Sequence, residues 1–134
     1  MIFLDSSLIV ADKIENDQHH KEAAKTMNDI ATGKYGNPLI SDYIFDEILT
    51  VIFSRSKKLP IAIETGQEIR NSVEIRRITE SDFEDAWQIF KNQKNTKLSF
   101  TDCTTLALML KEGIRNIATF DQDFSKIKEI NVVG

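Results

Sequence analysis

Four carboxylates stand out in this chain because they lie among residues that otherwise favour burial. Each one is at the end of an apolar run or inside an apolar helix pattern: Asp5, Glu47, Asp102 and Asp121. Like charges in one cleft raise one another's pKa and resist desolvation, so such a group generally needs a cation. The pattern therefore predicts a divalent-metal site, and carboxylate oxygens favour Mg²⁺ or Mn²⁺.

Glu47 is the most informative of the four, because Asp46 beside it is an internal control. Asp46 falls on the polar stripe of a helix predicted over 43–56, so we expect it to be solvated. Glu47 instead shares a face with Ile44 and Ile48. On spacing alone such a glutamate either extends its carboxylate to solvent or is held by a ligand, and the other carboxylates favour the ligand.

The other three carboxylates each have a plain structural explanation as well. Asp102 is the acidic residue of a helix-capping pattern that begins at Ser99, although capping does not exclude metal binding. Asp5 and Asp121 fit ordinary turn positions, since aspartate is common after strands. Asp123 could substitute for or assist Asp121, and we favour Asp121 because it is nearer the predicted strand end.

Other chemistries have little support. His19 and His20 are adjacent, so they would point to different faces of a helix, and no cysteine or second histidine pair completes a zinc site. Cys103 lies on an apolar helix stripe and is expected in the core. Trp87 and the phenylalanines are also expected in the core rather than on a base-stacking platform. There is no Gly-x-x-x-x-Gly-Lys loop and no Gly-x-Ser-x-Gly elbow.

The elements that must position these residues alternate between strands and helices. Apolar runs predict strands at 1–4, 38–41, 73–78, 117–120 and 130–133. Helical spacing and start signals predict helices at 17–32, 43–56 and 60–72, and from Thr79 and Ser99 onward. This alternation predicts an α/β fold with a mainly parallel sheet covered on both faces. Right-handed crossovers bring the carboxyl ends of the strands to one edge, so Asp5 and Asp121 would face one crevice.

Composition sets the broad class. With 134 residues, of which 41% are hydrophobic, the chain is expected to form a single domain over 1–134. One cysteine and an early charge at Asp5 favour a cytoplasmic protein, and no apolar run is long enough to span a membrane. A net charge of −4 argues against coating nucleic acid through bulk electrostatics. It does not exclude a nuclease, because metal-binding carboxylates are themselves negative.

With these residues placed, the chain resembles a PIN domain, and within that family the VapC-type ribonuclease toxins. The resemblance spans nearly the whole length and is carried by Phe3–Ser7, Glu47, Leu98–Asp102 and Ile117–Phe124. It implies a three-layer α/β/α sandwich and a Mg²⁺- or Mn²⁺-dependent endoribonuclease. It also implies an RNA substrate, a small antitoxin partner and a homodimer. Ser7 stands where many relatives carry asparagine, but its hydroxyl can still orient Asp5 or a water.

The resemblance also implies that the four carboxylates are the acidic site. Asp5, Asp102 and Asp121 would hold the principal ion, which polarises the scissile phosphodiester and activates a water. Glu47 would contact a second ion or orient that water. Three further residues are expected to support the site through hydrogen bonds: Ser7, Thr119 and Asp123.

Two alternatives remain open at the level of the sequence. One is a non-catalytic PIN-type module that binds RNA or protein, for which the acidic net charge and the serine at position 7 are the motives. The other is phosphoryl transfer on Asp5, which is disfavoured because such sites generally carry a second aspartate two positions on, where Ser7 stands.

Overall fold

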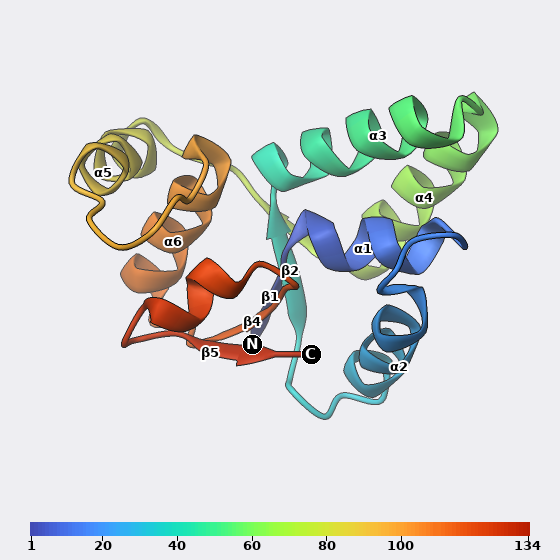
Figure 1. The fold of residues 1–134 in the computed structure, drawn as a ribbon, viewed down its shortest axis with the longest axis horizontal. Helices are drawn as coiled ribbons and strands as arrows, with labels where there is room; N and C mark the ends of the chain where they lie inside the picture. The colour runs from blue at the N-terminus through green and yellow to red at the C-terminus, as the bar shows by residue number, and fades with distance from the viewer.

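The strands of the computed structural model, which describes all 134 residues, form one parallel sheet. They are β1 (Ile2–Leu4), β2 (Pro38–Ser41), β3 (Glu74–Arg76), β4 (Asn116–Ala118) and β5 (Asn131–Val133). Their order is β3-β2-β1-β4-β5, so the direction of strand addition reverses between β1 and β4 (Figure 1). In open parallel sheets a crevice lies outside the carboxyl ends of the strands at this reversal.

Helices connect the strands and cover both faces of the sheet. They are α1 (Ser6–Lys13), α2 (His20–Ala31), α3 (Asp42–Ser56), α4 (Leu59–Ser72), α5 (Glu80–Lys91), α6 (Phe100–Glu112) and the 3₁₀ helix η1 (Gln122–Lys126). In Figure 1, α1 to α4 lie on one side of the sheet, whereas α5 and α6 lie on the other. The predicted three-layer α/β/α sandwich is therefore confirmed. None of the helices combines the length and apolar character that a bilayer crossing requires.

Two elements next to predicted site residues, β1 before Asp5 and α6 after Asp102, lie in the core. All of β1 is buried, as expected for a parallel strand with helices on both faces. In α6, every residue from 103 to 109 is buried, Cys103 among them. Asp5 follows β1 directly, and Asp102 precedes the buried part of α6. Both carboxylates are thus attached to well-packed backbone.

The apolar stripe of α5 was expected in the core, and this prediction is wrong. Phe83, Trp87 and Phe90 are 43%, 45% and 39% exposed, respectively. The reason is that α5 is an outer helix that packs mainly along α6, so only one of its faces is covered. That face carries Ala86 and Asp82, both of which are fully buried.

The residues of α3 are apolar nearly all round, which predicts a buried helix, and this prediction is only partly right. Ile44, Ile48 and Ile52 are fully buried. Phe53, however, is exposed and lines the groove between α3 and α4. Helical spacing shows which residues share a face, but α3 packs against α1 and α4 without being enclosed.

The helices α5 and α6 both begin with a capping box, as the sequence predicted. At the start of α5, Thr79 Oγ1 accepts a hydrogen bond from Asp82 N at 3.1 Å, and Asp82 Oδ2 accepts one from Thr79 N at 3.0 Å. Ser99 and Asp102 repeat the pattern at the start of α6, with both distances 3.1 Å. The two aspartates therefore occupy the same local position in consecutive helices.

Asp82 also joins α5 to α6 through an ion pair. Its Oδ1 accepts a hydrogen bond from Lys111 Nζ at 2.5 Å. Burial alone would raise the pKa of Asp82, but the Lys111 ammonium and the Thr79 hydrogen bonds outweigh it, so the pKa lies below its ordinary value. The ionised form of Asp82 therefore stabilises the packing of these two helices.

We expect Asp82→Asn to lower the free energy of unfolding at pH 7 by about 1–3 kcal/mol, because Lys111 loses its charged partner. The folded-state pKa is below the unfolded value, so this contribution is present above about pH 4 and is lost as the pH falls through the folded-state pKa. Urea unfolding of both proteins from pH 7 downward measures it. A difference that did not shrink in acid would contradict the assignment.

Candidate active site

Asp5 lies at the carboxyl end of β1, beside the point where the strand order reverses. It occupies the position before α1, yet its buried side chain makes no capping hydrogen bond to that helix. Instead, Asp5 Oδ2 accepts hydrogen bonds from Ser7 Oγ at 2.9 Å and from Thr119 Oγ1 at 2.6 Å. The backbone N of Asp5 donates to Ala118 O at 3.0 Å. Its carboxylate is thus held against the end of β4.

The hydroxyl groups of Ser7 and Thr119 have little freedom to turn elsewhere. Each hydroxyl has one proton, and both are directed at the same oxygen of Asp5. The hydroxyl oxygens in turn accept backbone N–H groups, Ser7 Oγ from Phe120 at 3.1 Å and Thr119 Oγ1 from Asp121 at 3.0 Å. The chain that follows β4 is therefore tied to the start of α1 through Asp5.

Glu47 approaches this edge of the sheet from α3. Its Oε1 accepts a short hydrogen bond from Ser6 Oγ. Its neighbours on the same helix face, Ile44 and Ile48, are fully buried, whereas Asp46 is exposed as predicted. Ser6 was not singled out from the sequence. Its partner Glu47 is 41 residues away, so no local pattern links the two. The position of Ser6 directly after Asp5 is the only sequence feature that could have pointed to it.

Asp102 shows that the predicted carboxylates act on one another. Burial raises its pKa to about 7, and the negative charges of Asp5 and Asp121 contribute to the rise against the opposing hydrogen bonds from Ser99. Burial likewise raises the pKa of Asp5, with the charge of Glu47 adding to it and the hydroxyls of the neighbouring residues opposing it. The structure therefore couples Asp102 to Asp5 and Asp121, and Asp5 to Glu47.

Asp123 has a different environment from Asp121. Its Oδ1 accepts a hydrogen bond from Lys126 Nζ at 2.9 Å, and its Oδ2 accepts one from Lys97 N at 2.8 Å. Lys126 first, and then Lys97, hold the pKa of Asp123 below its ordinary value. The backbone N of Asp123 donates to Asp121 Oδ1 at 2.9 Å. Asp123 thus contacts Asp121 through its backbone, while its carboxylate is paired elsewhere.

The donor set fits a hard divalent ion in its chemistry. The groups that converge are carboxylates, and a cation would relieve the repulsion that raises the pKa of Asp102. No three carboxylate, imidazole or thiolate groups lie close enough together in the structure to form a ready-made metal site. His19 and His20 do not join the carboxylates: the ring of His19 stacks on Phe120, and Nδ1 of His20 is 2.8 Å from Ala11 O.

Two pockets border the acidic residues, and Val51 of α3 lines both. One, of about 340 Å³, includes Tyr43, Glu47 and Thr101 in its wall. The other is about 250 Å³ in volume, and its lining includes Ser6, Ser7, His19, Arg55 and Phe120. Ser6 and Ser7, whose hydroxyl groups hold Glu47 and Asp5, therefore line a pocket that could not be located from sequence patterns.

Curated relatives match this chain over nearly its full length. The 23S rRNA-specific endonuclease VapC20 of Mycobacterium tuberculosis, in two strains, is 27% identical over 125 residues, which cover 93% of this chain and 92% of VapC20. The crystal structure of VapC20, described as a sarcin-ricin loop cleaving toxin, matches with a TM-score of 0.82 over 94% of each chain.

More distant solved structures share the fold. VapBC2 from Rickettsia felis, bound to a DNA fragment from its promoter, matches with a TM-score of 0.69 at 15% identity, over 99% of this chain and 98% of that one. A toxin-antitoxin complex from Klebsiella pneumoniae gives a TM-score of 0.67 at 16% identity, over 100% and 97%. The family model of the PIN domain matches residues 2–130. The parallel sheet agrees with this match, and so does the acidic edge, by which we mean the part of the sheet edge near Asp5, Glu47, Asp102 and Asp121. The chain therefore belongs to the PIN domain family.

Proposed function

We propose that this protein is a metal-dependent endoribonuclease that acts in the cytoplasm as the toxin of a toxin–antitoxin pair. The observation that carries the proposal is the partly buried carboxylate of Asp102 at the start of α6, whose pKa is raised to about 7 by desolvation and by the charges of Asp5 and Asp121. Repulsion between carboxylates lowers the stability of the fold, and a bound cation would remove this cost. The likeness to VapC20 supports RNA as the substrate.

The RNA class that we propose to test first is structured ribosomal RNA. VapC20 is described as specific for 23S rRNA and as cleaving the sarcin–ricin loop. Alignment over 93% of this chain supports a related substrate, and the PIN domain model matches residues 2–130, which include all four carboxylates. A short RNA hairpin with the sarcin–ricin loop sequence is therefore the most direct substrate for an assay.

Each acidic residue has a distinct role in this proposal. Asp5, Asp102 and Asp121 would hold Mg²⁺ or Mn²⁺, which when bound supplies positive charge to polarise the phosphodiester. Ser7 and Thr119 keep the Asp5 carboxylate in one orientation.

Glu47 comes from α3 and is held by the hydroxyl of Ser6 at the start of α1. We assign it to the orientation of the attacking water or to a second ion. As a carboxylate held by a hydroxyl, Glu47 keeps acceptor capacity for a water proton.

The first prediction from this proposed function concerns cleavage of the hairpin in the presence of Mg²⁺ or Mn²⁺. Asp5→Asn and Asp102→Asn should each lower kcat/KM by about 100-fold or more, because the ion loses a charged ligand, and EDTA should stop the reaction. Thr119→Val should cost about 10–100-fold, because Asp5 loses one of its orienting groups. Asp46→Asn is the matched control and should keep full activity.

Gel analysis of the end-labelled RNA gives these rates. Cleavage by the purified Asp5→Asn protein at the native rate would refute the site. RNA binding without any cleavage by the native protein would instead favour a non-catalytic module.

The second prediction concerns stability without metal. The folded-state pKa of Asp102 is about 7 and its unfolded value about 3.8. Ionised Asp102 therefore destabilises the fold progressively as the pH rises from about 4 through 7. At pH 8 in EDTA, Asp102→Asn should raise the free energy of unfolding by about 1–2 kcal/mol.

Thermal unfolding with added MnCl₂ completes this test. Mn²⁺ should raise the melting temperature of the native protein more at pH 8 than at pH 5, and should barely affect Asp102→Asn. Asp82→Asn, which changes the same capping position in α5, is the control and should respond to Mn²⁺ as the native protein does. Equal Mn²⁺ effects on all three proteins would contradict a metal role for Asp102.

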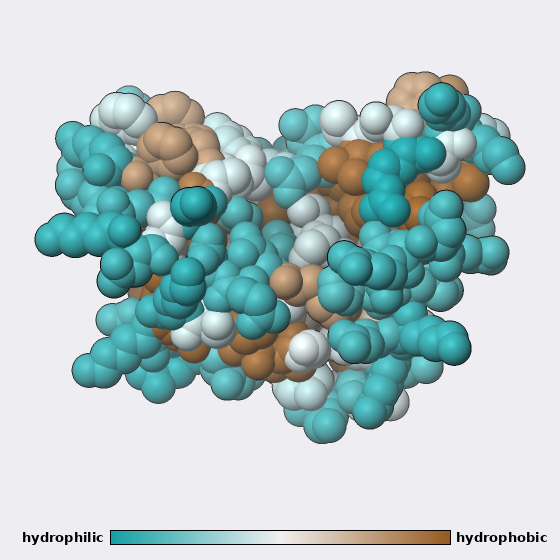
Figure 2. Space-filling model, in the orientation of Figure 1, coloured by the Kyte–Doolittle hydropathy of each residue, from teal (hydrophilic) through white to brown (hydrophobic).

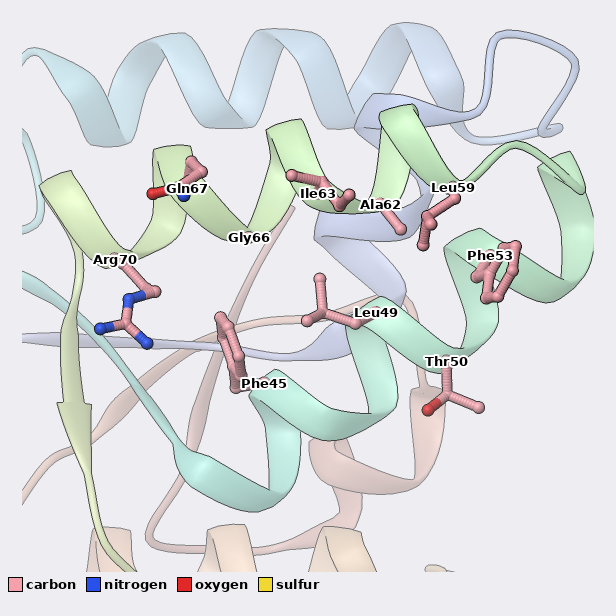
Figure 3. A pocket seen from close by; sticks show the side chains of 10 residues that line it. All are labelled: Phe45, Leu49, Thr50, Phe53, Leu59, Ala62, Ile63, Gly66, Gln67 and Arg70. Atoms are coloured by element: carbon pink, nitrogen blue, oxygen red, sulfur yellow. The ribbon is translucent and has the colours of Figure 1, made fainter.

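An apolar groove between α3 and α4 is the surface that we propose for the antitoxin. It has a volume of about 340 Å³, and Figure 3 shows Phe45 and Leu49 of α3 pointing toward α4 across it. Phe53, Leu59 and Ile63 on its rim are about half exposed. Figure 2 shows apolar atoms gathered over the same two helices. A protein partner would cover this surface, and the relatives solved as toxin–antitoxin assemblies support a partner of that kind.

The exposed aromatic face of α5 is the surface that we propose for a homodimer. The ring of Phe83 packs edge to face on Phe100 at 5.1 Å, and Trp87 stacks on Phe90 at 6.1 Å. Phe100 is two residues before Asp102. A second copy seated there would therefore lie next to the acidic edge.

The third prediction separates these two surfaces with one matched pair of variants. Ile63→Glu should weaken binding of the antitoxin protein by about 10-fold or more, because a charge enters the apolar groove, and should leave the dimer intact. Trp87→Glu should do the reverse. Light scattering of each variant, alone and co-expressed with that protein, measures both effects. Variants that behave alike would contradict the assignment of the two surfaces.

A further inference from the structure

The pocket lined by Ser6, Ser7, His19, Arg55 and Phe120 has no role in the site described so far. It lies next to the acidic edge, because Ser6 Oγ donates to Glu47 and Ser7 Oγ donates to Asp5. A molecule in this pocket would therefore touch the hydroxyls that hold two of the four carboxylates. The inference below rests on the proposed ribonuclease function and concerns how the RNA is held.

Arg55 provides positive charge on the same helix face as Glu47. Glu47, Val51 and Arg55 are spaced four residues apart in α3, so they form one row along the helix. With a rise of about 1.5 Å per residue, the row extends about 12 Å from the glutamate to the arginine. Among the residues that line the two pockets beside the acidic edge, Arg55 is the only lysine or arginine.

The guanidinium of Arg55 is held but not enclosed. Its Nη1 donates to Asp17 Oδ2 at 2.8 Å, and the side chain is 41% exposed. This is its one hydrogen bond to the protein, so the other N–H groups of the fork remain free. A guanidinium with free parallel N–H groups matches a phosphate group.

His19 and Phe120, which also line the pocket, form an aromatic pair. Their ring centroids are 4.3 Å apart and the planes are 9° from parallel. Phe120 N donates to Ser7 Oγ, and His19 N donates to Asp17 Oδ1 at 2.9 Å. Asp17 thus positions both His19 and Arg55. The hydrogen bond from Phe120 N to Ser7 fixes the His19–Phe120 pair relative to the acidic edge.

We propose that this pocket is a nucleotide-binding subsite, in which Arg55 binds an RNA phosphate beyond the scissile one and the His19–Phe120 pair supports the sugar or base. The physical need is clear, because a protein of net charge −4 with carboxylates at its reaction centre repels RNA. Arg55, a cation on the same helix row as Glu47, attracts the RNA strand and sets its register.

The test measures binding and cleavage of a fluorescein-labelled sarcin–ricin loop hairpin. Binding is followed by anisotropy in an Asp5→Asn background over a series of KCl concentrations, and cleavage is followed in the native background. Arg55→Ala should weaken binding about 5- to 10-fold and reduce the slope of log K against log[salt] by about one. In cleavage, KM should rise by a similar factor while kcat stays within about twofold. His19→Ala should weaken binding about fivefold with the salt slope unchanged.

Two control variants separate RNA contact from a structural effect. Asp17→Asn removes the negative charge beside Arg55 but keeps a side-chain oxygen that can accept the His19 N–H, so this variant should bind RNA at least as tightly as the native protein. Lys58→Ala removes an equal charge just beyond α3, outside both pockets, and should leave the affinity unchanged within about twofold. If Asp17→Asn and Arg55→Ala lost affinity equally, the ion pair would be merely structural and the inference would be overturned.

Failure of the subsite and failure of the proposed function give different results. If the native protein neither binds nor cleaves the hairpin or total RNA, the ribonuclease proposal itself is wrong. If the native protein cleaves RNA, and Arg55→Ala cleaves it with the same KM and salt dependence, only the subsite is wrong.

Discussion

The burial of Asp5 between the ends of β1 and β4 is the constraint on which the rest of the site depends. Its backbone N bonds to Ala118, and one oxygen of its carboxylate accepts both the Ser7 and the Thr119 hydroxyls. The contacts with Ala118 and Thr119 join segments more than 100 residues apart in the sequence. They also hold the Asp5 carboxylate away from solvent, and its charge contributes to the raised pKa of Asp102.

Asp82 and Asp102 show why a local motif does not reveal function by itself. Both close a capping box at the start of a helix, with nearly the same hydrogen bonds. Asp82 faces the Lys111 ammonium and its pKa lies below the ordinary value, whereas Asp102 faces other carboxylates and its pKa is about 7. The difference comes from tertiary neighbours, which the capping pattern does not encode.

The sequence was sufficient for the order of the five strands and of the helices α2 to α6, because apolar runs, cap residues and Gly113 mark their ends, but it did not predict α1 or η1. It was not sufficient for surfaces: the stripe of Phe83, Trp87 and Phe90 has the spacing of a core face, but no element covers it. The roles of the site residues themselves stay predictions. The pocket at Arg55 could not be foreseen either, because Asp17, His19 and Phe120 meet there only after folding.

The position of Asp102 within its capping box has one more consequence. Its Oδ2 accepts the backbone N–H of Ser99, which orients the carboxylate and leaves Oδ1 free of that bond. The loop before α6 is therefore anchored by the same group that faces Asp5. An ion that draws on this carboxylate would also tighten the first turn of α6, and amide hydrogen exchange in the Ser99 segment would slow in response. Occupancy of the acidic edge would then be readable from a backbone segment that never touches the ion.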